Sequence, residues 1–184
     1  MHLEAGPFHG VWSVELERHT DERGWFARSF DRDELLHAGV DLAVAQAGIS
    51  FNERARTLRG IHLQRSPHAE VKLIRCTRGR LFDVAVDLRP ASPTFGCWAG
   101  YELDEDGTSA VLIGEGLGHG FLTLEPRTEV SYLISCPYVP EAAAGVRWDD
   151  ADVGIDWPAS PEVVSDRDRA LGSLARYAAS AASG

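Results

Sequence analysis

Lysine is nearly absent from this 184-residue chain. The sequence has 18 basic residues, of which Lys72 is the only lysine and all the others are arginine, and they stand against 28 acidic residues. The resulting net charge of −10 argues against a nucleic-acid-binding surface, because a basic face could not outweigh the negative electrostatic potential of the whole chain. An anionic ligand would therefore depend on a local basic pocket.

Cysteines and long apolar runs are also scarce. Cys76, Cys97 and Cys136 are odd in number, widely spaced and set among apolar residues, which favours thiols that fill the core in a reducing compartment over disulfides or a metal site. No apolar run approaches the length of a membrane span, and residues 1–20 lack the core of a signal peptide. We therefore expect a cytoplasmic protein with no membrane contact.

Short apolar runs separated by turn residues make up most of the chain. This pattern, together with 44% hydrophobic residues and no internal repeat, predicts one mainly-β domain of the sandwich or barrel kind. We place the domain at residues 1–170. The Ala/Ser-rich tail at 171–184 is expected to begin as a helix and to fray at its end.

Two local elements can be predicted in more detail. Residues 72–88 indicate a β-hairpin that turns near Arg78 and Gly79, with alternate side chains from Phe82 to Leu88 on one face. Residues 31–39, DRDELLHAG, predict a short helix that ends at Gly39.

Several polar residues that can transfer protons fall on the predicted strands. Residues two apart on a strand share a face, so His62 faces the same way as Gln64, and Lys72 the same way as the apolar Ile74. In a small barrel, strands can each direct one side chain into a common interior. Histidine, lysine and tyrosine meeting there would supply a base, a cation and an acid; the candidates are His62, His119, Lys72 and Tyr132.

Each of these residues also has a purely structural interpretation. A single histidine on a strand is more often a hydrogen-bonded structural residue, and a single tyrosine is more often part of the core. A lysine can cover apolar surface with its stem and reach the rim. Asp166 and Asp168, in the segment SDRD, are equally consistent with surface charge or the start of a helix.

Two segments together resemble the paired motifs of cupins. They are GIHLQRSPHAEVKLIRCTRG at 60–79 and GEGLGHGF at 114–121. In metal-binding cupins these motifs supply three histidines and a glutamate, which His62, Glu70 and His119 would match in three places. Gln64 stands where the fourth ligand would be, and an amide is a poor metal ligand beside imidazole and carboxylate. A metal site is therefore possible but not favoured.

Seven segments carry a more specific resemblance, to the dTDP-4-dehydrorhamnose 3,5-epimerase family of sugar-nucleotide cupins. They occur in the family's order over roughly residues 5–170: DERGWFARSF (21–30), TLRGIHLQ (57–64), KLIRCTRGRLFDVAVDLRPASPTFG (72–96), GEGLGHGFLTL (114–124), EVSYLIS (129–135), GVRWDDADVGIDWP (145–158) and SDRD (165–168). The resemblance implies a cupin-type jelly-roll β-barrel with a few short helices. It also implies a homodimer, a nucleotide-sugar substrate of the dTDP type, and no metal or other cofactor.

The resemblance also implies roles for individual residues. His62 is similar to the catalytic base, Asp168 to the residue that orients it, and Tyr132 to the general acid. The remaining matches are to substrate-contacting positions: Arg23, Phe26, Gln46, Arg59, Lys72 and His119. Of these, Arg23 and Phe26 match positions that contact the nucleotide across a dimer interface.

The chemistry of these residue types agrees with that activity. A 4-keto group acidifies the C–H bonds at C3 and C5, and histidine has a pKa suited to removing such a proton. The enolate oxygen needs a fixed positive charge, for which the single lysine, Lys72, is suited. A phenol on the opposite face, Tyr132, could then return a proton with inversion.

The chain departs from the family pattern at two places. It has Gln46-Ala47-Gly48 where the family commonly has Gln-Asp-Asn, and Arg28 where a glutamate is common. The nucleotide, the sugar and the inverted carbon therefore stay open, as does the pathway. A metal-dependent cupin, a sugar-binding cupin without activity and a keto-isomerase are the rival interpretations.

Overall fold

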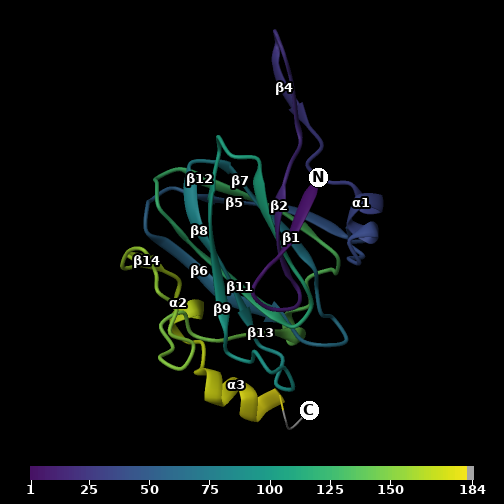
Figure 1. The fold of residues 1–184 in the computed structure, drawn as a ribbon. Helices are drawn as coiled ribbons and strands as arrows, with labels where there is room; N and C mark the ends of the chain where they lie inside the picture. Colours follow the sequence, from purple (N-terminus) through teal and green to yellow (C-terminus); the bar gives the residue numbers. More distant parts are fainter. Residues whose placement is uncertain (182–184) are drawn as a thin grey trace.

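Two antiparallel β-sheets face each other in the computed structural model, which describes residues 1–181 (Figure 1). One sheet has the strand order β1-β2-β10-β7-β12-β5, and the other has the order β13-β6-β11-β8-β9 with β14 added in parallel to β6. This arrangement confirms the predicted mainly-β fold of the jelly-roll kind. The strands are β1 (His2–Ala5), β2 (Val11–Glu15), β3 (Arg18–Asp21), β4 (Gly24–Ala27), β5 (Gln46–Asn52), β6 (Thr57–Gln64), β7 (Lys72–Arg78), β8 (Arg80–Asp87), β9 (Trp98–Asp104), β10 (Ser109–Ile113), β11 (Leu117–Thr123), β12 (Thr128–Ile134), β13 (Ala143–Gly145) and β14 (Val163–Val164).

The helices are few and short, as the sequence predicted. They are α1 (Arg32–His37), a 3₁₀ helix η1 (Pro140–Ala142), α2 (Asp166–Arg169) and α3 (Leu174–Ala181). The Asp31 carboxylate caps α1 by accepting hydrogen bonds from the backbone at 33 and 34, and Gly39 follows the helix with φ +85°. The predicted helix at 31–39 is thus confirmed.

Strands β7 and β8 do not form the hairpin predicted for residues 72–88. β7 pairs with β10 and β12 in one sheet, whereas β8 pairs with β9 and β11 in the other. Gly79, with φ +71°, carries the chain from one sheet to the other. The strands themselves were predicted correctly, but alternation within a strand does not say which strand is its neighbour.

Both faces of β8 are buried, and this explains the dense apolar pattern there. Leu81 and Ala85 point into the core between the sheets, while Val84 and Val86 pack in a second core on the outer face. The C-terminal segment covers that outer face, where Leu174 and Tyr177 of α3 are buried.

The C-terminal tail begins as a helix, as expected. Residues 174–181 form α3, whose Leu174 and Tyr177 belong to the same buried cluster as Val84 and Val86 of β8. The tail's last residues, 182–184, which were expected to fray, lie outside the described residues.

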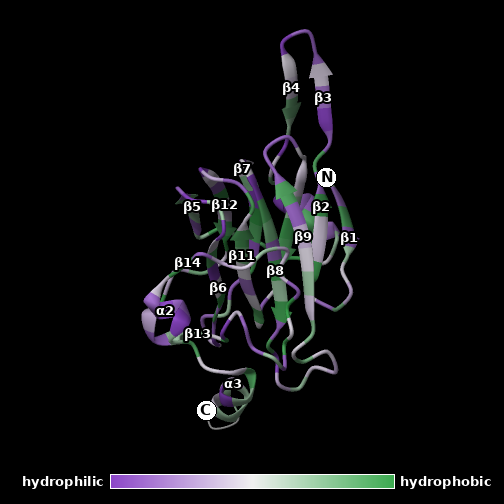
Figure 2. Cartoon of the chain, turned by 90° about the vertical axis from the view of Figure 1, so that its left-hand side faces the viewer, coloured by the Kyte–Doolittle hydropathy of each residue, from purple (hydrophilic) through white to green (hydrophobic). Residues whose placement is uncertain are grey.

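A two-stranded hairpin formed by β3 and β4 projects from the barrel (Figures 1 and 2). Its side chains are largely exposed, including Trp25 at 48% and Phe26 at 66%. Elsewhere, the three cysteines are free, as predicted, but the core position expected for them holds for Cys76 alone, because Cys97 is exposed and Cys136 is half-buried. No helix in the described residues is long and apolar enough to cross a membrane.

Candidate active site

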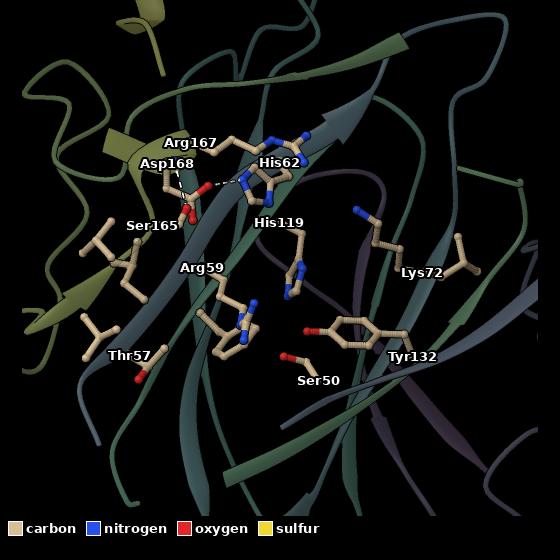
Figure 3. A pocket seen from close by; sticks show the side chains of 15 residues that line it. Ser50, Thr57, Arg59, His62, Lys72, His119, Tyr132, Ser165, Arg167 and Asp168 are labelled. Carbon is tan, nitrogen blue, oxygen red and sulfur yellow. Dashed lines mark hydrogen bonds and ion pairs between the residues drawn. The ribbon is translucent and has the colours of Figure 1, made fainter. Parts of the chain in front are cut away.

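A pocket of about 520 Å³ lies between the sheets, where it receives side chains from strands of both (Figure 3). Strands β5, β7 and β12 contribute from one sheet and β6 and β11 from the other, and residues 163–168 close one side. This first pocket brings together six of the residues singled out in the sequence: Arg59, His62, Lys72, His119, Tyr132 and Asp168.

His62 on β6 is hydrogen-bonded to Asp168 at the start of α2. His62 Nε2 donates to Asp168 Oδ1 at 2.6 Å, and the backbone N–H of Gly60 donates to the other carboxylate oxygen at 3.3 Å. Burial raises the pKa of Asp168, but these hydrogen bonds and the nearby Ser165 outweigh burial and hold it below its usual value. The carboxylate therefore stays ionised, and the ring presents Nδ1 as its remaining nitrogen.

A second histidine–aspartate pair lies beside the first. His119 is the register partner of His62 on the neighbouring strand β11, and its Nε2 donates to Asp83 Oδ1 at 2.7 Å. The Asp83 side chain is fully buried. Asp83 was not predicted from the sequence, because the apolar alternation of residues 82–88 dominates that segment; the available signal was a carboxylate at the centre of the strand.

Tyr132 on β12 lies across the pocket from His62, with His119 between them in Figure 3. Its ring packs edge-on to that of His119, with centroids 6.0 Å apart. Burial, reinforced by the negative charge of Asp83, raises the pKa of Tyr132 well above its usual value despite the opposing effect of Arg59. The phenol is therefore held in its protonated form.

Lys72 forms an ion pair with Glu70, whose carboxylate also binds Gln64. Lys72 Nζ lies 2.7 Å from Glu70 Oε1, and Gln64 Nε2 donates to Glu70 Oε2 at 3.0 Å. Both charged side chains are largely buried, so the ammonium is fixed in place. From the sequence, Glu70 was considered as a metal ligand, and its spacing of two residues from Lys72 was the available signal for the ion pair.

The metal-binding interpretation is not supported by this geometry. His62, Glu70 and His119 each interact with a different partner, namely Asp168, Lys72 and Asp83. Within residues 1–181, no group of three or more histidine, cysteine, aspartate or glutamate side chains is placed to hold a metal ion.

Two arginines supply positive charge to the pocket. Arg59 donates from Nε to Asn52 Oδ1 at 2.9 Å. Arg167, at the start of α2, reaches over the mouth beside His62 (Figure 3). The sequence analysis named both neighbours of Arg167 in SDRD but missed Arg167 itself; its adjacency to Asp168 was the available signal.

Gln46 lines a smaller second pocket of about 190 Å³ rather than the first. The two pockets share lining residues that include His62, Lys72 and Arg167, so they adjoin. Gln46 Oε1 accepts a hydrogen bond from the backbone N–H of Tyr138 at 3.1 Å.

Arg23 and Phe26 are not brought to the pocket of their own chain. They lie on the projecting β3–β4 hairpin, where the Arg23 guanidinium pairs with Asp21 and the Phe26 ring is exposed. A role for them in the site would require the hairpin of another copy.

Gly60 lets strand β6 approach β11 closely beneath the two histidines. It has φ +125°, and a Cβ there would lie 2.5 Å from Gly120 Cα and 2.9 Å from the His119 carbonyl oxygen. We expect Gly60→Ala to lower the free energy of unfolding by at least about 2 kcal/mol, because left-handed strain adds to backbone overlap.

Urea unfolding would measure this effect, with Gly48→Ala as the matched control. Gly48 has no left-handed φ, and no heavy atom lies within 4 Å of a Cβ built there, so we expect a change below about 1 kcal/mol. Equal unfolding midpoints for the two variants would contradict the prediction.

Comparison with known proteins decides the family. The family model described as dTDP-4-dehydrorhamnose 3,5-epimerase matches residues 6–176. The chain belongs to this family. The resemblance seen in the sequence is thereby confirmed over nearly the whole chain.

Curated relatives of this family member include enzymes with two different names. A dTDP-4-dehydrorhamnose 3,5-epimerase of Sinorhizobium fredii is 39% identical over 95% of this chain and 90% of its own. A dTDP-4-dehydrorhamnose 3-epimerase of Streptomyces niveus is also 39% identical, over 92% of this chain and 82% of its own.

Solved structures give the same result. The chain is similar to NovW, a 4-keto-6-deoxy sugar epimerase from the novobiocin biosynthetic gene cluster of Streptomyces spheroides, with TM-score 0.93 and 37% identity; the match covers 98% of this chain and 91% of NovW. It is also similar to ChmJ, a 3′-monoepimerase from Streptomyces bikiniensis in complex with dTDP-quinovose, with TM-score 0.84 and 39% identity, over 90% and 84% of the chains.

Proposed function

We propose that this protein is an isomerase that inverts C3, C5 or both in a 4-keto-6-deoxy nucleotide sugar, without a bound metal. The observation that carries the proposal is the arrangement of the His62–Asp168 pair and Tyr132, which face each other across one pocket. A base and an acid on opposite sides of a flat enolate give inversion rather than simple exchange of the proton.

The reaction begins with removal of a proton next to the ketone. His62 takes it through Nδ1, because Nε2 is engaged by Asp168. The Asp168 carboxylate stabilises the imidazolium that forms and fixes the tautomer of the neutral ring. Tyr132 then gives its phenolic proton to the carbon from the opposite face.

The enolate oxygen is stabilised by hydrogen-bond donors already in place. Lys72 is held by Glu70, and His119 is held by buried Asp83, so neither side chain has to reorganise when negative charge develops. Both line the first pocket together with the two proton-transfer residues. This assigns Lys72 the electrostatic role expected from its being the only lysine.

The nucleotide is proposed to be dTDP, held by local arginines. On a chain with a net charge of −10, Arg59 and Arg167 are the basic groups that face the pocket beside Lys72. ChmJ was solved with dTDP-quinovose, and an epimerase from Bacillus anthracis was solved with TDP. Guanidinium groups suit phosphate through paired hydrogen bonds.

One relative supports the two catalytic roles. A double variant of ChmJ was solved in which one histidine and one tyrosine are replaced, and these are separated in sequence by the same number of residues as His62 and Tyr132. The assay that tests the function is turnover of a panel of 4-keto-6-deoxy nucleotide sugars with chelator present. Failure to epimerise any dTDP-linked member would contradict the proposal.

A homodimer is proposed in which each β3–β4 hairpin completes the partner's site. The hairpin projects away from its own barrel, and large apolar side chains are exposed both there and on the edge strand β5: Trp25, Phe26, Ile49 and Phe51. Their burial by a second copy would stabilise the assembly.

Mixing two inactive variants tests this arrangement. We expect His62→Ala and the double variant Arg23→Ala/Phe26→Ala to be nearly inactive alone. After subunit exchange, each heterodimer would contain one intact site, so activity should return to roughly a quarter of the wild-type value. Sedimentation would verify the exchange; a fully active monomer, or no recovery in exchanged dimers, would contradict the proposal.

A further inference from the structure

Ser50 lies beside Tyr132 and has no role in the mechanism above. Its side chain lines the first pocket from strand β5, and in Figure 3 its hydroxyl lies next to the Tyr132 hydroxyl. The Ser50 oxygen is buried and forms no hydrogen bond of ordinary geometry. It is nevertheless close enough to the Tyr132 hydroxyl to oppose the rise in the pKa of Tyr132 that burial causes. A buried hydroxyl without a hydrogen-bond partner destabilises the fold unless it interacts with a ligand or with water.

The same face of β5 leads from Ser50 towards solvent. Residues 46, 48 and 50 alternate onto this face, and Gln46 at the strand end is exposed. Gly48, between them, is the register partner of Tyr132, and no heavy atom lies within 4 Å of where its Cβ would be. The missing side chain thus leaves room for water behind the Ser50 hydroxyl.

Tyr132 must be re-protonated after each proton transfer, and this route could supply the proton. After giving its proton to carbon, it is a tyrosinate in a buried site, where burial disfavours the charge. A sugar that filled the first pocket would shield Tyr132 from solvent at the mouth, so a second inversion would require another source of protons. His62 differs, because its side chain is 33% exposed and also lines the second pocket, where it can release its proton to solvent.

We propose that Ser50 relays a proton from water to the Tyr132 oxygen while a sugar fills the pocket, which permits a second inversion in one binding event. The Ser50 O–H bond breaks as the tyrosinate takes its proton, and a water molecule at Gly48 re-protonates the Ser50 oxygen. The hydroxide left behind is neutralised by the proton that His62 releases. This inference rests on the proposed function and assigns Ser50 a role within it.

The test follows deuterium in D₂O with enzyme in excess over a dTDP-4-keto-6-deoxy sugar, quenched at short times. Wild type should label both C3 and C5. Ser50→Ala should label the first carbon at the wild-type rate but the second at least about 10-fold more slowly, so that singly labelled sugar accumulates. Ser50→Thr keeps the hydroxyl and should behave as wild type.

Ser131→Ala is the matched control. Ser131 is next to Tyr132 on β12 but faces outward, opposite the exposed Ile49, and should leave both rates unchanged. The relay is contradicted if Ser50→Ala labels the second carbon at the normal rate, if both carbons slow equally, or if wild type labels only one carbon. Absence of any label with wild type would instead contradict the proposed function itself.

Discussion

His62→Ala is expected to abolish epimerisation. The imidazole is the base proposed to remove the proton next to the ketone, and the Asp168 carboxylate already orients it in the pocket. We expect turnover of a dTDP-4-keto-6-deoxy sugar, followed by nuclear magnetic resonance, to fall by at least about 10³-fold.

Tyr132→Phe provides the contrast that separates base from acid. With the base intact, some exchange of the substrate proton with solvent should survive, whereas inversion should slow strongly because the opposite-face donor is gone. Equal loss of exchange and inversion in both variants would contradict the two-face assignment. So would exchange by His62→Ala at the wild-type rate.

Asp168→Asn is expected to have the next largest effect, a fall in turnover of roughly 10²–10⁴-fold. An amide cannot stabilise the imidazolium, and it favours the wrong tautomer of His62 by offering a donor to Nε2. Asp166→Asn is the matched control, since Asp166 is exposed and lies two residues earlier on the same helix. Near-normal turnover of Asp168→Asn would contradict the assignment.

The same carboxylate also links stability to pH. Because the pKa of Asp168 is held below its usual value, its contribution to stability is present above about pH 4 and is lost as the pH falls through the lower folded value. Asp168→Asn should therefore flatten the acid limb of a plot of unfolding midpoint against pH.

The sequence predicted which residues share the pocket better than it predicted which strands pair. The alternation of side chains along β6, β7 and β12 was sufficient to predict that His62, Lys72 and Tyr132 face one interior. This is because the direction of a side chain on a strand depends on its position in that strand alone. The pairing of β7 with β8 was predicted wrongly, because strand partners depend on contacts distant in sequence.

Partners of the site residues were the main omissions. Asp83 interacts with His119 across two strands that are paired only in the fold, so this contact is not visible in one segment of sequence. Glu70 holds Lys72 rather than serving a metal, and their spacing of two residues was the available signal. Asp168 was assigned a role only through the family resemblance, since its segment is also consistent with surface charge or the start of a helix.

The measurement that tests the central claim most directly is incorporation of deuterium by the wild-type enzyme in D₂O, with chelator present. We expect a dTDP-4-keto-6-deoxy sugar to gain label at C3, C5 or both, the carbons that flank the ketone, and the configuration to invert at the labelled carbon. Label at the same rate in His62→Ala, or activity that is lost with chelator and restored by a divalent metal, would contradict it.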